Sequence, residues 1–145
     1  MENGNKRKKF PTGKARLEHL SDLRVLDANL ATLGTIPTLT HLTVTGLSSV
    51  VDVSCLHVAC PNLISLSLVG AKLVQSERSR SANLSNWHLS LTSLSLRDTL
   101  GRAWVDLVRC SPHLAWLSIF NVVISDSDVA SIVDTNSLSK LEDLR

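Results

Sequence analysis

The chain has 145 residues, of which 43% are hydrophobic and 19% charged, and its formal net charge is +2. These totals suit one folded domain and argue against an intrinsically disordered chain and against nucleic-acid binding by the chain as a whole. Three cysteines do not suit a disulfide framework, and no run of about 18 apolar residues could span a membrane, so we expect a cytoplasmic or nuclear protein without a membrane partner.

Residues 1–19 are polar and basic, and we expect them to form a disordered tail ahead of one folded domain over residues 20–145. The tail lacks the apolar segment of a secretory signal. Four consecutive basic residues suit a nuclear-import signal: Lys6, Arg7, Lys8 and Lys9. The alternative is a solvated tail without that function, and we favour this second interpretation.

An early copy of the motif L-x-x-L-x-L is expected at residues 23–28, where Leu23, Leu26 and the weaker Ala28 match it. The interval from Leu23 to the next copy at Leu39 is only 16 residues, which is short for a full unit. Two explanations of this short interval remain open: either the first unit is degenerate, or its register differs from the one assigned here.

From residue 39 onward the motif recurs with few changes. Its apolar positions, apart from Val44, are Leu39, Leu42, Leu63, Leu66, Leu68, Leu91, Leu94, Leu96, Leu114, Leu117 and Ile119. Leu141 and Leu144 begin a truncated sixth copy, so the copies from residue 39 onward start 24, 28, 23 and 27 residues apart. Repeats of about 20–29 residues stack so that each copy supplies one strand and buries its apolar side chains against its neighbours. These residues are therefore the predicted core.

The segments between the copies contain helix and loop signals. A short helix is expected within residues 48–60, ending near Cys60, and residues 73–89 are expected to form an irregular loop. Residues 101–110 place Trp104, Leu107 and Val108 on one helical face.

A further helix is expected within residues 125–136. Ser125 is its predicted N-cap, with Asp128 three residues later completing a capping box. Val129, Ile132 and Val133 then form the stripe that we expect to be buried.

The motif, its period and the lead-in "CPNL" at residues 60–63 resemble the leucine-rich-repeat superfamily over about residues 20–145. The cysteine-containing lead-ins are most similar to the intracellular repeats of F-box/leucine-rich-repeat proteins, although no F-box precedes them. The resemblance implies an α/β solenoid of about five repeats plus a truncated sixth, with parallel strands on the concave face and helices and loops on the convex face. We expect the array to continue beyond the end of the chain. The family's consensus asparagine or cysteine after the strand is replaced by Ala71, Thr99 and Val122.

In such a fold the residues that flank the pattern leucines face the concave surface. Most of them are small and polar, but one strand adds Trp116 and Phe120, beside Arg97 of its neighbour. Tryptophan and arginine are enriched at binding hot spots. The candidate partner-binding residues are Trp116, Phe120, Arg97, Ser118 and Ser95. The alternative is that a later segment covers the two aromatic residues and makes them part of the core.

The predicted function is a non-catalytic protein-protein interaction scaffold. The resemblance implies a more specific role, the recognition of substrates for a ubiquitin ligase. The alternatives are a nucleic-acid-associated nuclear regulator that uses the basic tail, and an enzyme of unrecognised type. No catalytic residue, cofactor or metal site is predicted, because Cys55, His57 and Cys60 lie close in sequence without a fourth zinc ligand.

Overall fold

The computed structural model describes residues 20–27, 34–75, 88–133 and 138–145. The predicted tail at residues 1–19, with its basic run, lies outside the described residues, as do Ala28 and most of the predicted loop at 73–89. Within the described ranges, no helix has the length and apolar character needed to cross a membrane.

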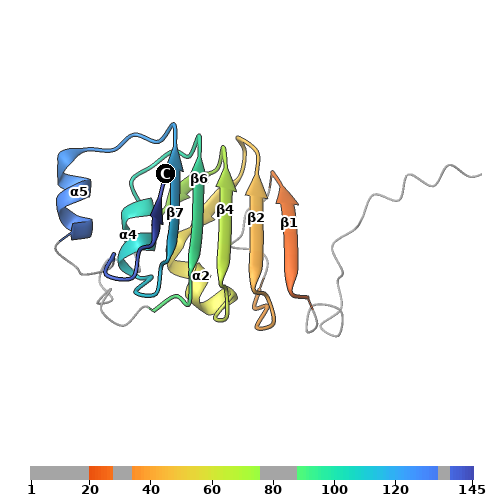
Figure 1. Ribbon diagram of the computed structural model, residues 1–145. Helices are drawn as coiled ribbons and strands as arrows, with labels where there is room; N and C mark the ends of the chain where they lie inside the picture. The colour runs from red at the N-terminus through yellow and green to blue at the C-terminus, as the bar shows by residue number, and fades with distance from the viewer. Residues whose placement is uncertain (1–19, 28–33, 76–87, 134–137) are drawn as a thin grey trace, which may run out of the picture.

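Six parallel strands form one open sheet, and they lie side by side in the order in which the chain produces them (Figure 1). They are β1 (Asp22–Leu26), β2 (His41–Thr45), β4 (Ser65–Val69), β6 (Ser93–Arg97), β7 (Trp116–Phe120) and β8 (Asp143–Leu144). The prediction of an α/β fold with parallel strands is confirmed.

The connecting segments place helices behind this sheet. Figure 1 shows α2 (Val53–Ala59) and α4 (Trp104–Arg109) behind the strands, and α5 (Asp126–Val133) beyond the end of the sheet that β7 and β8 form. A second, two-stranded parallel sheet joins β3 (Val50–Asp52) to β5 (Lys72–Val74). Neither β3 nor β5 was predicted from the sequence, and each is only three residues long.

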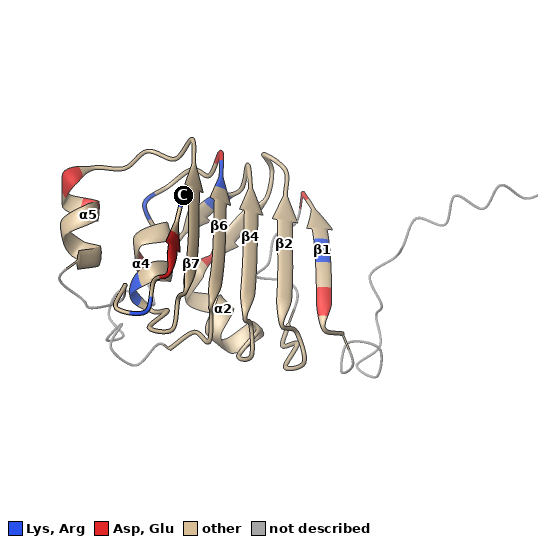
Figure 2. Cartoon of the chain, viewed as in Figure 1, with Lys and Arg blue, Asp and Glu red and all other residues tan. Residues whose placement is uncertain are grey.

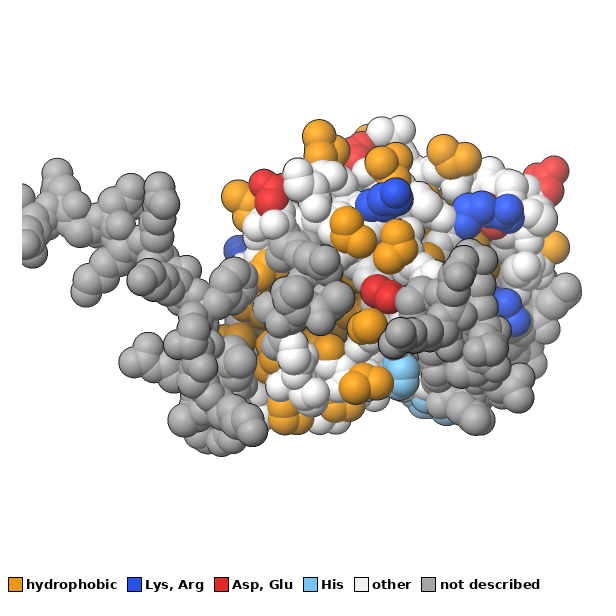
Figure 3. All heavy atoms as spheres, turned by 180° about the vertical axis from the view of Figure 1, so that it is seen from behind, with side chains coloured by type: hydrophobic (Ala, Val, Ile, Leu, Met, Phe, Trp, Pro, Cys, Tyr) orange, Lys and Arg blue, Asp and Glu red, His pale blue; other side chains and the backbone are white. Residues whose placement is uncertain are grey.

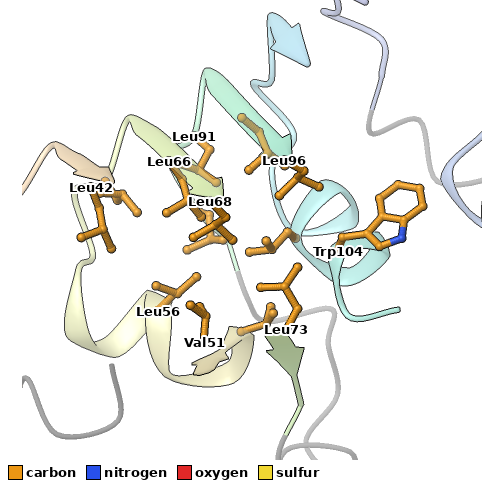
Figure 4. Close-up of a cluster of buried hydrophobic side chains, with 14 of the residues drawn as sticks. Leu42, Val51, Leu56, Leu66, Leu68, Leu73, Leu91, Leu96 and Trp104 are labelled. Carbon is orange, nitrogen blue, oxygen red and sulfur yellow. The ribbon is translucent and has the colours of Figure 1, made fainter. Parts of the chain in front are cut away.

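The pattern residues lie in two ladders across the sheet because the strands pair in matching register. Leu42, Leu66, Leu94 and Leu117 are aligned in one ladder, and Val44, Leu68, Leu96 and Ile119 in the other. The leucines predicted as core are at most 2% exposed, while Ile119 is partly buried. Figure 4 shows strand leucines directed toward Leu56 of α2 and Leu73 of β5, so the core lies between the sheet and the segments behind it.

The register predicted for the first copy is wrong. Leu23 pairs with Leu42 and Val25 with Val44, so the motif begins at Leu20, three residues earlier than predicted. Leu26 is 72% exposed and Val25 only 5%, because alternate side chains of a strand point to opposite faces. The first strand is therefore in register with the others, although the interval from Leu20 to Leu39, 19 residues, is still shorter than the later ones.

The predicted helices are confirmed, and one predicted face is wrong. Trp104, Leu107 and Val108 are buried along α4, and α2 ends at Ala59 with Cys60 as its C-cap. In α5, however, Val129 is 50% exposed and Val133 is 64% exposed. The apolar stripe of α5 is largely uncovered because the helix lies beyond the end of the sheet rather than behind it.

The capping box at the start of α5 is present as predicted. The Ser125 N–H donates to Asp128 Oδ2 at 2.9 Å, and the Asp128 N–H donates to Ser125 Oγ at 3.3 Å. Arg102, from the segment before α4, donates to Asp128 Oδ1 through Nη2 at 2.6 Å and Nε at 3.1 Å. This ion pair ties α5 to the preceding unit.

Each of five strands is followed by a residue with positive φ. These residues are Asp27, Gly46, Gly70, Asp98 and Asn121, with φ of 48°, 114°, 73°, 51° and 52°. Gly, Asn and Asp are the residues that tolerate this conformation best. The next positions hold Ala71 and Thr99, both buried, and the partly buried Val122, so these residues pack inward at the turn.

Candidate protein-binding face of the sheet

The face of the six-stranded sheet turned away from α2 and α4 is called the open face below (Figure 1). Alternation along each strand sends the pattern leucines to the core and the residues between them to the open face. The register aligns Thr43, Ser67, Ser95 and Ser118 across four neighbouring strands, and all four are half-buried. The middle of the open face is therefore a row of hydroxyl groups carried by small side chains.

Trp116 stands at one end of the open face. It is aligned with Ser93 of β6 on one side and Asp143 of β8 on the other, and it is half-buried. Because β8 pairs with β7, Trp116 does not lie on the edge strand of the sheet. Its position leaves part of the indole in contact with solvent.

Arg97 and Phe120 form a pair at the other end of the same two strands. They are aligned in register, and the Arg97 guanidinium carbon lies 5.0 Å from the centre of the Phe120 ring. This is a cation–π distance. Phe120 is 58% exposed, so among the described residues it belongs to the surface and not to the core.

The candidate residues predicted from sequence therefore occupy two separate places. Trp116 and Phe120 are four residues apart on β7, which places their Cα atoms roughly 13 Å apart at about 3.3 Å per residue. Ser118 lies between them and is aligned with Ser95. The prediction that both aromatic residues lie beside Arg97 holds only for Phe120.

Charged side chains lie around the open face rather than in its middle. Figure 2 shows them on β1, at the upper end of β6 and on β8, whereas β2 and β4 carry none. The residues concerned are Asp22, Arg24, Arg97, Asp98 and Asp143. The middle of this surface can be desolvated without burying a charge, which favours contact with a macromolecule.

A polar contact that the sequence analysis missed borders the Arg97–Phe120 pair. Asn121 Nδ2 donates to Asp98 Oδ1 at 2.6 Å, and both residues have positive φ. The Asp98 N–H also donates to the Phe120 carbonyl oxygen at 3.0 Å. The sequence signal was available, because an Asp, Asn or Gly recurs one residue after each of these strands.

Metal ligands and cysteine thiols are two kinds of reactive group that the described residues can be compared with. Within them, no group of three or more His, Cys, Asp or Glu side chains is placed to hold a metal ion. Burial raises the pKa of the Cys60 thiol to about 11. Burial, assisted by the Asp106 carboxylate and opposed by Arg109, raises the pKa of the Cys110 thiol to about 11 as well. Both thiols stay protonated near neutral pH and are poor nucleophiles.

The other face of the molecule differs in composition from the open face. Figure 3 shows it from behind, with hydrophobic side chains interspersed with Lys, Arg, Asp and Glu. Val58, on α2, is 60% exposed.

Comparison of the chain with profiles of known protein families, with curated proteins and with solved structures found no match in any of the three. A function for the chain must therefore be argued from its own residues. The feature that the structure offers for this purpose is the open face.

Proposed function

We propose that this protein is a leucine-rich-repeat solenoid that acts as a non-catalytic protein-binding scaffold, with the open face as its interface. One observation carries the proposal. Among the described residues, helices cover only one face of the parallel sheet, and the other face is lined by small hydroxyl side chains with aromatic residues at two corners. Parallel sheets are normally covered on both faces, so a surface of this kind suits a partner that provides the second cover.

The solenoid interpretation is supported by the repeating geometry. Neighbouring strands of the six-stranded sheet follow each other in chain order, and equivalent pattern residues are aligned from strand to strand. Stacked repeats have this property because each unit contacts mainly its neighbours.

The Arg97–Phe120 pair and Trp116 are the residues expected to anchor a partner. Aromatic residues and arginine dominate the energetics of protein interfaces, whereas small hydroxyl residues contribute complementarity. Because Trp116 and Phe120 lie at opposite ends of β7, a partner must extend along this strand to contact both.

Substrate recognition for a ubiquitin ligase is the specific role that we propose to test first. The support is the resemblance of this chain's lead-ins to those of F-box/leucine-rich-repeat proteins. Cys60 and Cys110 occupy matching places in two of these lead-ins. Each of these cysteines is the C-cap of a helix behind the sheet, and each is buried.

The proposal is tested by affinity purification from cells with two matched variants. Ser67→Arg places a long cation in the middle of the open face, and Val58→Arg places the same group on the outer surface of α2. Partners identified by mass spectrometry with the wild type should be lost with Ser67→Arg and retained with Val58→Arg. Ubiquitin-ligase subunits among the lost proteins would support the specific role. If the two variants retain the same partners, the open face is not the interface.

Binding strength tests the proposed anchors once a partner has been identified. Arg97→Ala combined with Phe120→Ala should weaken binding at least tenfold, because hot-spot truncations cost about 2 kcal/mol or more. Co-purification of nucleic acid, with affinity that falls steeply as salt is raised, would instead support a nucleic-acid-binding function.

A further inference from the structure

Strand β1 stands at one edge of the six-stranded sheet, and among the described residues its neighbour is β2. The N–H and C=O groups of one residue in a strand point to the same side, and the side alternates from residue to residue. The Ser21 carbonyl oxygen accepts from the His41 N–H at 3.0 Å, so the odd-numbered residues of β1 face β2. The backbone groups of Asp22, Arg24 and Leu26 therefore point away from the sheet.

These outward groups form an accessible edge. No hydrogen bond between described residues reaches them. The side chains of Asp22 and Arg24 are exposed, and Leu26 is 72% exposed. An unpaired strand edge of this kind is a template for pairing with another strand.

The sequence of β1 is complementary to itself when two copies run antiparallel. Asp22 and Arg24 flank Leu23 symmetrically, and Figure 2 shows both charges on β1. With Leu23 of one copy opposite Leu23 of the other, Asp22 of each copy faces Arg24 of its partner. Opposite residues in such a pair exchange both backbone hydrogen bonds, and this register uses the outward groups of Asp22 and Arg24.

Charge selects this register over its neighbours. A shift that sets Arg24 opposite Arg24, or Asp22 opposite Asp22, brings like charges together. Opposite charges that face each other across two strands are stabilising, whereas like charges are destabilising.

Charge also disfavours an open-ended stack in which β8 of one copy pairs in parallel with β1 of the next. The register across the sheet gives Asp143 the same position along β8 as Asp22 has along β1. Arg145, two residues after Asp143, is equivalent to Arg24 in the same way. Parallel stacking in register would place Asp beside Asp and Arg beside Arg, so a closed pair with two-fold symmetry is favoured.

We propose that β1 is an interaction surface for a second copy of this chain. The two β1 strands pair antiparallel around Leu23, with an Asp22–Arg24 ion pair on each side of it. The two-fold axis is perpendicular to the sheet, so the two open faces lie on the same side of one continuous sheet. This pairing does not depend on the function proposed for the open face.

The test is sedimentation velocity of the 145-residue chain at low salt, over a range of concentrations. The wild type should dimerise with a Kd below about 1 mM. Asp22→Arg and Arg24→Asp each set like charges opposite each other and should weaken dimerisation roughly tenfold or more. An equimolar mixture of these two variants restores opposite charges and should form the heterodimer. The double variant, with both substitutions in one chain, should recover the homodimer.

A control variant and a cross-link test the location and the register. Arg145→Asp makes the same charge change on β8 and should leave dimerisation unchanged. Leu23→Cys should form a disulfide-linked dimer on mild oxidation, because opposite Cα atoms at such a position are about 4.5 Å apart. Leu26→Cys should not, because in this register Leu26 lies far from its own copy. Wild type oxidised in the same way accounts for any cross-link through Cys55.

Four results would each overturn the proposal. The wild type stays monomeric up to about 1 mM, or neither the mixture nor the double variant restores the dimer. Arg145→Asp weakens dimerisation as much as Arg24→Asp does, or Leu26→Cys cross-links as readily as Leu23→Cys.

Discussion

Leu66 illustrates how stability is distributed at the scale of single residues. It is 1% exposed and is aligned with Leu42 on one side and Leu94 on the other. Ser67, the next residue, faces the opposite side of the same strand and is half-buried. Adjacent positions therefore differ sharply in what they tolerate, because a one-residue step crosses from the core to the open face.

Leu66→Asp should destabilise the protein by several kcal/mol, since it places an unpaired charge among leucines. The whole free energy of unfolding of a domain is only about 5–15 kcal/mol, so much of the variant should be unfolded. Ser67→Asp is the matched control and should change stability little. Urea denaturation of both variants measures the difference, and equal midpoints would contradict the register described here.

Gly101 is a position at which adding a single methyl group should destabilise the protein. Its φ is 92°, and a Cβ atom there would lie 2.3 Å from the Leu73 carbonyl oxygen. Gly34 has a φ of 67°, but a Cβ atom there would meet no atom of the described residues within 4 Å. Gly101→Ala should therefore cost clearly more than Gly34→Ala, whose cost is limited to about 1–2 kcal/mol of backbone strain. Thermal denaturation of the two variants compares them. A smaller loss of stability for Gly101→Ala than for Gly34→Ala would mean that β5 does not approach this turn closely.

At the scale of elements, α5 is held mainly by polar contacts at its first turn. Ile132 is its one buried apolar side chain, and Asp128 is its buried carboxylate. The Arg102 hydrogen bonds, followed by those from the Ser125 backbone and side chain, lower the pKa of Asp128 from an ordinary value of 3.8 to about 2. The contacts of the ionised form thus favour the folded state.

The pKa of Asp128 predicts how α5 responds to acid. A carboxyl whose pKa is lower in the folded state stabilises that state above its unfolded pKa and loses the contribution as pH falls through its folded pKa. The contribution should therefore be complete above about pH 4 and disappear toward pH 2. In Arg102→Gln, Asp128 should titrate closer to 3.8, and the α5 amide resonances should change at higher pH. NMR titration of the Asp128 carboxyl measures its pKa in the wild type and in Arg102→Gln. Identical titration curves would show that the ion pair does not form in solution.

At the scale of the whole molecule, the sheet is a linear array with two ends. Among the described strands, β4 and β6 each pair along their full length with a strand on both sides, whereas β1 has one neighbour and β8 pairs through only two residues. Stability in such arrays depends on contacts between adjacent units, so the ends open more readily than the middle.

Hydrogen exchange should therefore be slowest in β4 and β6 and faster toward β1 and β8. Amides of β7 should exchange faster than those of β4, because β8 covers only part of β7. Exchange measured by NMR on the monomeric chain gives the order directly. Uniform protection across all six strands would mean that the sheet opens as one unit.

Most of the parallel strands and of the core residues could be predicted from the sequence. The spacing of Leu63, Leu66 and Leu68, repeated along the chain, specifies both the period of the units and the face that each strand buries. The helix signals at α4 and the capping box of α5 were also sufficient to predict these two helices, because both signals depend on contacts within a few residues. The candidate residues of the open face followed from the same alternation.

The neighbours of these elements could not be predicted from the sequence, because they depend on how the units pack. Local pattern matched both Leu20 and Leu23 as the start of the first copy, and pairing with β2 selected Leu20. The apolar stripe of α5 predicted burial, but the helix stands beyond the sheet and leaves Val129 exposed. Arg97 lies over Phe120 and apart from Trp116 because strand register, which is a property of two strands, places them so. Periodicity specifies a face, and only packing specifies what covers it.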